Sequence, residues 1–262
     1  MKKILFLTYY YPPDLSAGSF RSKALISKIA DQRKDYKIQV LTTSPNRYTS
    51  YSSSDLGNES NSSISIRRHE VRLKSKNFIN QIISFIFFAR FCIKETKNDH
   101  YDLVFATSSR LMTAFLGAFI ASRKKTMLYL DIRDIFRDTI KDVFPNIIAG
   151  LLAPIILRIE KFTYNQATKI NLVSAGFTEY FEKNFSYNKL SYFTNGIDKE
   201  FLKDSSFYSK NDFNHQNLKV VYAGNIGDGQ ALHKIIPVLA KKFPNIEFFI
   251  IGDGSRKYKL EK

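Results

Sequence analysis

The residues with the clearest chemical potential follow the first apolar run of the chain. Residues 3–8 (KILFLT) predict a buried strand, and they lead into 9–21, YYYPPDLSAGSFR. The prolines keep this turn extended, and the small residues at 16–19, Gly18 among them, open a helix. The N–H groups at the start of such a helix can bind an anion such as phosphate. A plain helix cap with a glycine in its first turn explains these residues equally well.

The segment LDIRD at 130–134 follows another predicted strand. Asp131 and Asp134 flank Arg133, so their carboxylates could position a hydroxyl group or balance a phosphate. The alternative is a solvated loop with one internal salt bridge. Both explanations place these side chains beyond the carboxyl end of a strand, where open parallel sheets bind their ligands.

Glycine-rich turns occur near the C-terminal end. Residues 222–230 (YAGNIGDGQ) carry three glycines, and residues 251–254 (IGDG) carry two. Glycine allows a backbone to approach a phosphate closely. The spacing differs from the G-x-G-x-x-G dinucleotide motif, and a simple turn also explains Gly252 and Gly254.

Metal and thiol chemistry have little support in the sequence. The four histidines show no paired metal-ligand spacing, so no metal is expected. The single cysteine, Cys92, lies in an apolar run, which favours a buried structural thiol over a nucleophile.

Strands must alternate with helices to position these turns. Apolar runs predict strands at 3–8, 38–43, 65–73, 103–107, 127–131, 169–173, 191–194, 219–223 and 246–251. Helical spacing predicts helices at 17–33, 77–94, 111–122, 145–164, 175–184, 231–242 and from 255 onward. Residues 45–63 predict a loop. This alternation indicates an α/β fold with an open parallel sheet.

A change in composition predicts two domains. We expect an N-terminal Rossmann-like domain at 1–198, a linker at 199–217 and a partial C-terminal Rossmann-like domain at 218–262. Two strands and two helices form a small core. We therefore expect the sequence to be part of a longer two-domain protein. We also expect residues 218–262 to pack loosely and to expose Phe248, Phe249, Ile250 and Ile251, and the 262-residue chain to be inactive alone.

The charge balance predicts anionic partners. Forty basic and 24 acidic residues give a net charge of +16, which suits nucleic acid, acidic lipid headgroups or phosphorylated small molecules. The apolar stretch 78–93 is shorter than a membrane-spanning helix. It could be a helix at a membrane surface or a core helix, and basic residues precede it: Arg67, Arg68, Arg72, Lys74 and Lys76.

Taken in order, these segments resemble glycosyltransferase family 4, whose members have two Rossmann-like domains in the GT-B architecture. The resemblance is greatest to the branch that builds bacterial surface polysaccharides, including amino-sugar transferases of O-antigen and capsule synthesis. The matching segments lie at 3–21, 130–134, 158–177, 193–198, 220–236 and 248–261. The resemblance implies a GT-B-like α/β fold whose N-terminal domain is complete and whose C-terminal donor domain is partial.

The resemblance assigns roles to residues of the first domain. Gly18 matches the glycine whose loop meets the donor diphosphate and the acceptor. Asp134 matches a polar residue that contacts the acceptor or donor sugar, and it is the candidate catalytic residue. Asn195, Gly196 and Asp198 match the segment that leads to the hinge.

Other residues match the donor domain of the family. Gly224, Asn225 and Gly227 correspond to the loop near the diphosphate, and Gly252 and Gly254 to the loop beside the nucleotide.

The sequence also departs from the family pattern. Many members clamp the diphosphate with an arginine and a lysine in the first donor-domain loop, whereas residues 224–233 contain neither. The family's E-x7-E motif, which binds the donor sugar and ribose, would lie beyond Lys262.

The resemblance implies a retaining glycosyltransferase that uses a nucleotide-diphosphate sugar, without a metal cofactor, in surface polysaccharide synthesis. Its acceptor would be a lipid-linked or free saccharide, and its location would be the cytoplasm. If residues 78–93 form a helix at a membrane surface, the protein would also make peripheral contact with the inner face of an anionic membrane. The alternative is a non-catalytic basic module that binds nucleic acid, or an inactive partner subunit. Because no helix-turn-helix, RRM, KH or zinc pattern occurs, no specific nucleic acid is expected.

Overall fold

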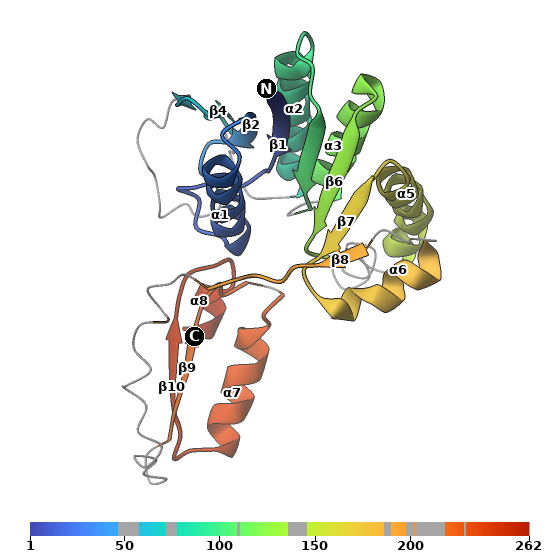
Figure 1. Cartoon of the computed structure of the whole chain (residues 1–262). Coiled ribbons are helices and arrows are strands. Elements are labelled where there is room, and N and C mark those ends of the chain that lie inside the picture. The colour runs from blue at the N-terminus through green and yellow to red at the C-terminus, as the bar shows by residue number, and fades with distance from the viewer. Residues whose placement is uncertain are drawn as a thin grey trace. The chain divides into compact units, whose positions relative to one another are not determined.

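The computed structural model describes residues 1–46, 58–71, 78–108, 111–135, 146–185, 190–197, 202, 218–227 and 229–261. The chain divides into two compact units, Met1–Gly196 and Ile197–Lys262 (Figure 1). Each unit contains parallel strands with helices between them, as the alternation in the sequence predicts.

The first unit is built on an eight-stranded sheet with the order β3-β4-β2-β1-β5-β6-β7-β8. Neighbouring strands are parallel except for β3 and β4, which are antiparallel. The strands are β1 (Lys2–Leu7), β2 (Tyr36–Thr43), β3 (Glu59–Ser60), β4 (Ile64–His69), β5 (Leu103–Thr107), β6 (Met127–Ile132), β7 (Lys169–Leu172) and β8 (Leu190–Tyr192).

Helices cover both faces of this sheet because successive side chains of a strand point to opposite faces. In β1, Ile4 and Phe6 pack with Ile26 of α1, whereas Leu5 and Leu7 belong to the core beneath the other helices. Figure 1 shows α1 apart from α2, α3 and α5. The helices are α1 (Ala17–Gln32), α2 (Phe78–Thr96), α3 (Leu111–Lys124), α5 (Asn146–Asn165), a 3-10 turn (Ala175–Phe177) and α6 (Thr178–Asn184).

Gly117 allows α3 to lie unusually close to the sheet. A Cβ at this position would overlap the Cβ of Ala106 in β5, so no larger residue fits without moving the helix. The sequence pattern does not reveal this contact, because Gly117 reads as an ordinary small residue within an apolar helix.

Two details differ from the sequence-based expectation. Residues 59 and 60 form β3 inside the segment expected to be a loop, because their backbones pair with Ser65 and Ile66 of β4. The strand expected at 65–73 ends at His69, and residues 72–77 lie outside the described part of the chain.

The second unit contains two parallel strands, β9 (Lys219–Ala223) and β10 (Glu247–Ile251), with α7 (Leu232–Lys242) and α8 (Lys257–Leu260). Among its described residues, the buried apolar side chains are Ile226 and Leu232. Phe249 and Ile251 are exposed, as expected, because two strands leave one sheet face without a covering layer. The expectation was wrong for the alternate residues, Phe248 and Ile250, which are half-buried.

Cys92 lies on the inner face of α2 and is fully buried, which confirms the expected burial. Burial raises the pKa of the Cys92 thiol well above its usual range. Because the thiolate is the reactive form, we expect Ellman's reagent to react very slowly with the native protein at pH 8. After the protein is unfolded in urea, the reagent should modify one thiol per chain. Rapid reaction of the native protein would contradict this packing.

The two units predict a defined pattern of proteolysis. Trypsin should cut first within residues 199–217, since few contacts cross a domain boundary. It should leave a stable N-terminal fragment of about 23 kDa, scaled from 30.3 kDa for 262 residues to the 196 of the first unit. Mass spectrometry identifies the cut sites, and earlier cleavage inside residues 1–196 would show that the first unit is not an independent folding unit.

Candidate functional site

The turn between β1 and α1 is fixed by hydrogen bonds on both sides. The hydroxyl groups of Thr8 and Thr43 donate to the carbonyl oxygens of Tyr10 and Tyr9, at 2.8 and 2.6 Å. The buried Asp14 carboxylate accepts a hydrogen bond from the Asn46 N–H at 3.2 Å. These hydrogen bonds therefore fix the conformation of the turn against the carboxyl ends of β1 and β2.

The first turn of α1 has the features of an anion site. Ser16 caps the helix by accepting a hydrogen bond from the Ser19 N–H at 3.1 Å, and Gly18 and Ser19 are buried. Within the described part of the chain, the Ser19 hydroxyl forms no hydrogen bond. A buried hydroxyl without a partner is costly, and the first N–H groups of a helix also need partners from outside it. A bound phosphate oxygen could accept hydrogen bonds from the Ser19 hydroxyl and from these N–H groups.

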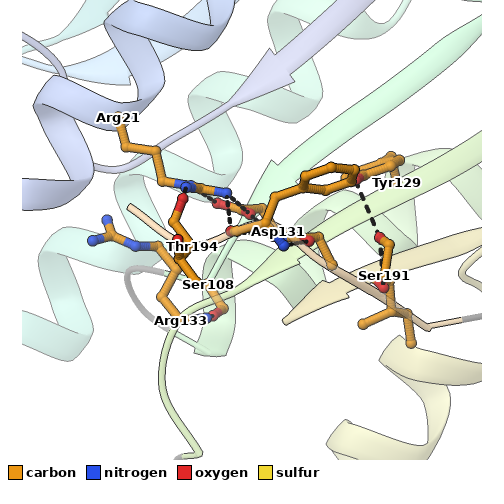
Figure 2. Close-up of polar contacts among 10 residues, drawn as sticks. Arg21, Ser108, Tyr129, Asp131, Arg133, Ser191 and Thr194 are labelled. Atoms are coloured by element: carbon orange, nitrogen blue, oxygen red, sulfur yellow. Dashed lines mark hydrogen bonds and ion pairs between the residues drawn. The ribbon is translucent and has the colours of Figure 1, made fainter. Parts of the chain in front are cut away.

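An ion pair between Arg21 and Asp131 connects α1 to β6 (Figure 2). The Arg21 Nε and Nη2 donate to the two Asp131 carboxylate oxygens at 3.0 and 2.9 Å. The side chains are 10% and 1% exposed. Such a two-bond pair between a guanidinium and a carboxylate is strong and directional.

The same pair also holds the chain after β8. Arg21 donates to the carbonyl oxygens of Phe193 and Thr194 at 2.9 and 2.7 Å. Asn171 in β7 donates to Asp131 at 2.8 Å and accepts from the Phe193 N–H at 2.8 Å. This network fixes the segment just before the proposed hinge residues.

The two carboxylates of the segment 130–134 have different environments. Asp131 is buried and pairs with Arg21, so the solvated loop with an internal salt bridge is wrong for this residue. Its backbone carbonyl accepts from the Ser108 N–H, and the Ser108 hydroxyl accepts from the Arg133 N–H at 2.8 Å. Asp134, the candidate catalytic residue, is exposed just after the strand. The sequence identified this segment but did not single out Arg21.

The hinge candidates are only partly described. Asn195 and Gly196 are exposed, and a Cβ at Gly196 would meet no atom within 4 Å. Asp198 lies outside the described residues.

In the second unit, the loop at 224–227 and the loop at 251–254 are hydrogen-bonded to each other. The Gly224 N–H donates to the Ile251 carbonyl and the Ile226 N–H to the Asp253 carbonyl, both at 2.9 Å. A Cβ at Gly252 would overlap the carbonyl oxygen of Gly224, so glycine is required by this packing alone.

The remaining residues of these loops also have local roles. A Cβ at Gly254 would overlap the carbonyl oxygen of Ile226. Asn225 donates to the Gln230 side chain at 2.8 Å, and the Gly227 N–H donates to the same oxygen at 3.2 Å. These contacts shape the turn before α7.

Potential metal ligands do not gather in the described residues: no group of three or more His, Cys, Asp or Glu side chains could hold an ion.

Three solved structures that share this fold are GT-B glycosyltransferases. Sucrose-phosphate synthase from Thermosynechococcus elongatus aligns with a TM-score of 0.67 and 10% identity, over 96% of this chain and 62% of that chain. HepE from Anabaena, solved with UDP, aligns with a TM-score of 0.58 and 16% identity, over 100% of this chain and 64% of that chain.

A third structure is the apo form of WaaB, a lipopolysaccharide outer core galactosyltransferase, with a TM-score of 0.55 and 11% identity over 99% of this chain and 63% of that chain. The chain thus has the predicted GT-B-like α/β fold and spans less than two thirds of the length of these proteins. No protein-family model matches the sequence, and no curated protein matches it.

The Arg21–Asp131 pair predicts an unequal effect of its two partners on stability. Arg21→Met should lower the free energy of unfolding by about 3–5 kcal/mol, because it leaves a buried carboxylate without its cation. Asp131→Asn should cost less, since Arg21 keeps two carbonyl partners and some solvent contact. Urea unfolding measures both values.

Arg33→Met is the matched control, because the Arg33–Asp35 pair is exposed. It should change the unfolding midpoint far less than Arg21→Met does, although the Arg33 guanidinium also lies 4.2 Å from the centre of the Tyr36 ring. Equal effects of Arg21→Met and Arg33→Met would contradict the structural role of the buried pair.

Proposed function

We propose that this protein is a glycosyltransferase that moves a sugar from a nucleotide-diphosphate sugar to a lipid-linked or saccharide acceptor. The observation that carries the proposal is the GT-B-like fold, which nearly the whole chain shares with the three solved glycosyltransferases. One of them, HepE, is solved with UDP and with UDP-glucose. The finer proposal is a retaining, metal-independent enzyme of family 4 in bacterial surface-polysaccharide synthesis, which the order of the sequence motifs supports.

The first turn of α1 is proposed to bind phosphate oxygens of the donor. Gly18 keeps the helix start free of a side chain, and the buried Ser19 hydroxyl supplies a donor. The leaving diphosphate gains negative charge in the transition state. Fixed N–H groups and the positive end of a helix stabilise such charge without reorganisation.

The loops of the second unit are proposed to contact the nucleotide. Gly224, Asn225 and Gly227 shape the turn before α7, and Gly252 and Gly254 allow the neighbouring turn to pack against it. In this proposal the glycines act by setting the backbone path, and backbone N–H groups make the contacts with the diphosphate.

Asp134 is proposed to act on the acceptor. Its exposed carboxylate follows β6 at the carboxyl edge of the sheet, where it could orient an acceptor hydroxyl or accept its proton. Asn195, Gly196 and Asp198 are proposed as the hinge, with Arg21 holding the chain just before it.

Binding of UDP and UDP-glucose to the 262-residue chain tests the function, with double-stranded DNA as the competing ligand. Isothermal titration at physiological salt should detect weak binding of the nucleotide, since the chain spans less than two thirds of the length of its structural neighbours, and no binding of DNA. DNA affinity that disappears with modest salt would reflect only the net charge of +16. DNA binding that persists, without nucleotide binding, would favour the nucleic-acid module.

Two substitutions in α1 test the phosphate site. Ser19→Ala should weaken UDP binding about tenfold or more, the loss expected for one hydrogen bond to a charged group. It should leave the melting temperature unchanged or higher, because it removes a buried hydroxyl without a partner. Gly18→Val should abolish UDP binding, because its side chain would fill the space of the phosphate.

Ser27→Ala, at an exposed position of the same helix, is the control and should change neither property. Unchanged UDP affinity in both Gly18→Val and Ser19→Ala would remove this turn from the site.

A further inference from the structure

Helix α2 is apolar on both its inner and its outer face. Its inner face carries the buried Phe85, Phe88 and Cys92. Its outer face carries large apolar side chains that are 38–55% exposed and share one side of the helix by their spacing: Ile82, Ile83, Ile86, Phe87 and Ile93. A core helix needs only one apolar face, so the outer residues require a separate explanation.

The exposed charges beside these residues are positive. Arg90 and Lys94 are exposed on α2, and Lys97 follows the helix. The one acidic residue of α2, Glu95, lies 4.0 Å from Arg67 and is only 26% exposed.

The neighbouring helices α3 and α5 also have apolar and basic side chains that are at least partly exposed. Helix α3 contains no acidic residue and ends in Arg123 and Lys124. On α5 the exposed residues include Ile155, Arg158 and Lys161. The acidic residue of α5, Glu160, is fully buried. The described outer surface of these three helices is therefore apolar and cationic.

A pocket of about 370 Å³ lies between the ends of α2 and α3. Its lining combines apolar Ile93, Phe119 and Ile120 with the cationic Lys97, Arg123 and Lys124. The Arg123 guanidinium lies 5.5 Å from the centre of the Phe119 ring. The Lys124 ammonium donates to the carbonyl oxygens of Lys97 and Asp99 at 2.7 and 2.8 Å. An apolar wall beside the other two cations, Lys97 and Arg123, suits the phosphate end of an amphiphile.

We propose that the outer face of α2, together with the α2–α3 pocket, docks onto an anionic phospholipid bilayer, with a headgroup phosphate in the pocket. Exposed apolar side chains flanked by Lys and Arg are the pattern that binds at the membrane interface. Nucleic acid would use the cations but would leave the apolar side chains in water. This surface lies entirely in the first unit and does not depend on the proposed function.

The structure assigns the cations to different residues than the sequence did. Of the basic cluster expected to face the membrane, Arg68 is buried and pairs with Glu59 at 2.9 Å, and Arg67 is near Glu95. The other members, Arg72, Lys74 and Lys76, lie outside the described residues.

The docking surface and the turn that precedes α1 lie on opposite sides of α2. The Tyr9 ring, in the turn before α1, lies 5.2 Å from the Phe88 ring and 6.1 Å from the Phe85 ring, on the inner face of α2. One helix, about 10 Å thick, thus separates the bilayer from this turn. Among the described helices, none is both long and apolar enough to cross a membrane.

A single tryptophan tests whether α2 enters the bilayer. The chain contains no tryptophan, so Phe87→Trp places one fluorophore on the proposed surface. Its emission should shift to shorter wavelength on vesicles of phosphatidylglycerol and phosphatidylethanolamine, and not on neutral phosphatidylcholine vesicles. Phe20→Trp, at an exposed position on α1, should show no shift. An unshifted Phe87→Trp spectrum on anionic vesicles would overturn the proposal.

Charge reversal tests the cations by vesicle flotation. Arg90→Glu with Lys94→Glu should lower the partition coefficient about 25-fold or more, a factor of about five for each basic residue removed. Lys23→Glu with Lys28→Glu, exposed on α1, makes the same change in net charge and should retain binding. Equal losses in the two double variants would show a general charge effect and contradict a specific surface.

Ile83→Ser with Phe87→Ser tests the apolar side chains without changing charge, and it should also reduce flotation. Protection of the Cys92 thiol in each variant shows that the unit remains folded. Full binding by the serine variant, or equal binding of the unaltered protein to neutral vesicles, would overturn the proposal.

Discussion

The buried ion pair between Arg21 and Asp131 is the constraint on which the carboxyl edge of the first unit depends. A carboxylate that is 1% exposed has lost its water, and beside the hydrogen bond from Asn171 it needs a cation with well-placed N–H groups. Arg21 meets this need and also binds the carbonyls of Phe193 and Thr194. The pair therefore sets both the position of the first turn of α1 and the direction in which the chain leaves β8.

This constraint acts within a sheet whose two faces are covered differently. Helix α1 packs on one face, whereas α2, α3 and α5 form the layer on the other. Tyr9 joins the candidate site to that layer by packing on Phe88. The turn that leads into α1 and the apolar outer surface of α2 thus lie on opposite sides of one helix, whereas α1 itself packs on the other face of the sheet.

The order and type of most elements could be predicted from the sequence because apolar periodicity is a local property. Strand β5 lies at the predicted residues, 103–107, as does β9 at 219–223. The site was harder to predict, since Arg21 and Asp131 are 110 residues apart and no local pattern marks their pairing. The buried position of Arg68 was missed for the same reason: its partners, Pro12 and Glu59, come from other strands and turns.

Because of the close contact between Gly252 and the carbonyl of Gly224, a glycine at position 252 is not by itself evidence of a catalytic or binding role. Any side chain at position 252 would disrupt the packing of the two loops, whether or not a substrate is bound. Selection for folding alone would therefore retain this glycine in a descendant that had lost its catalytic activity. A Gly-Asp-Gly turn in a distant homologue accordingly indicates a shared architecture and not a shared activity. Under the proposed function, loss of activity would first become visible at exposed polar positions such as Asp134.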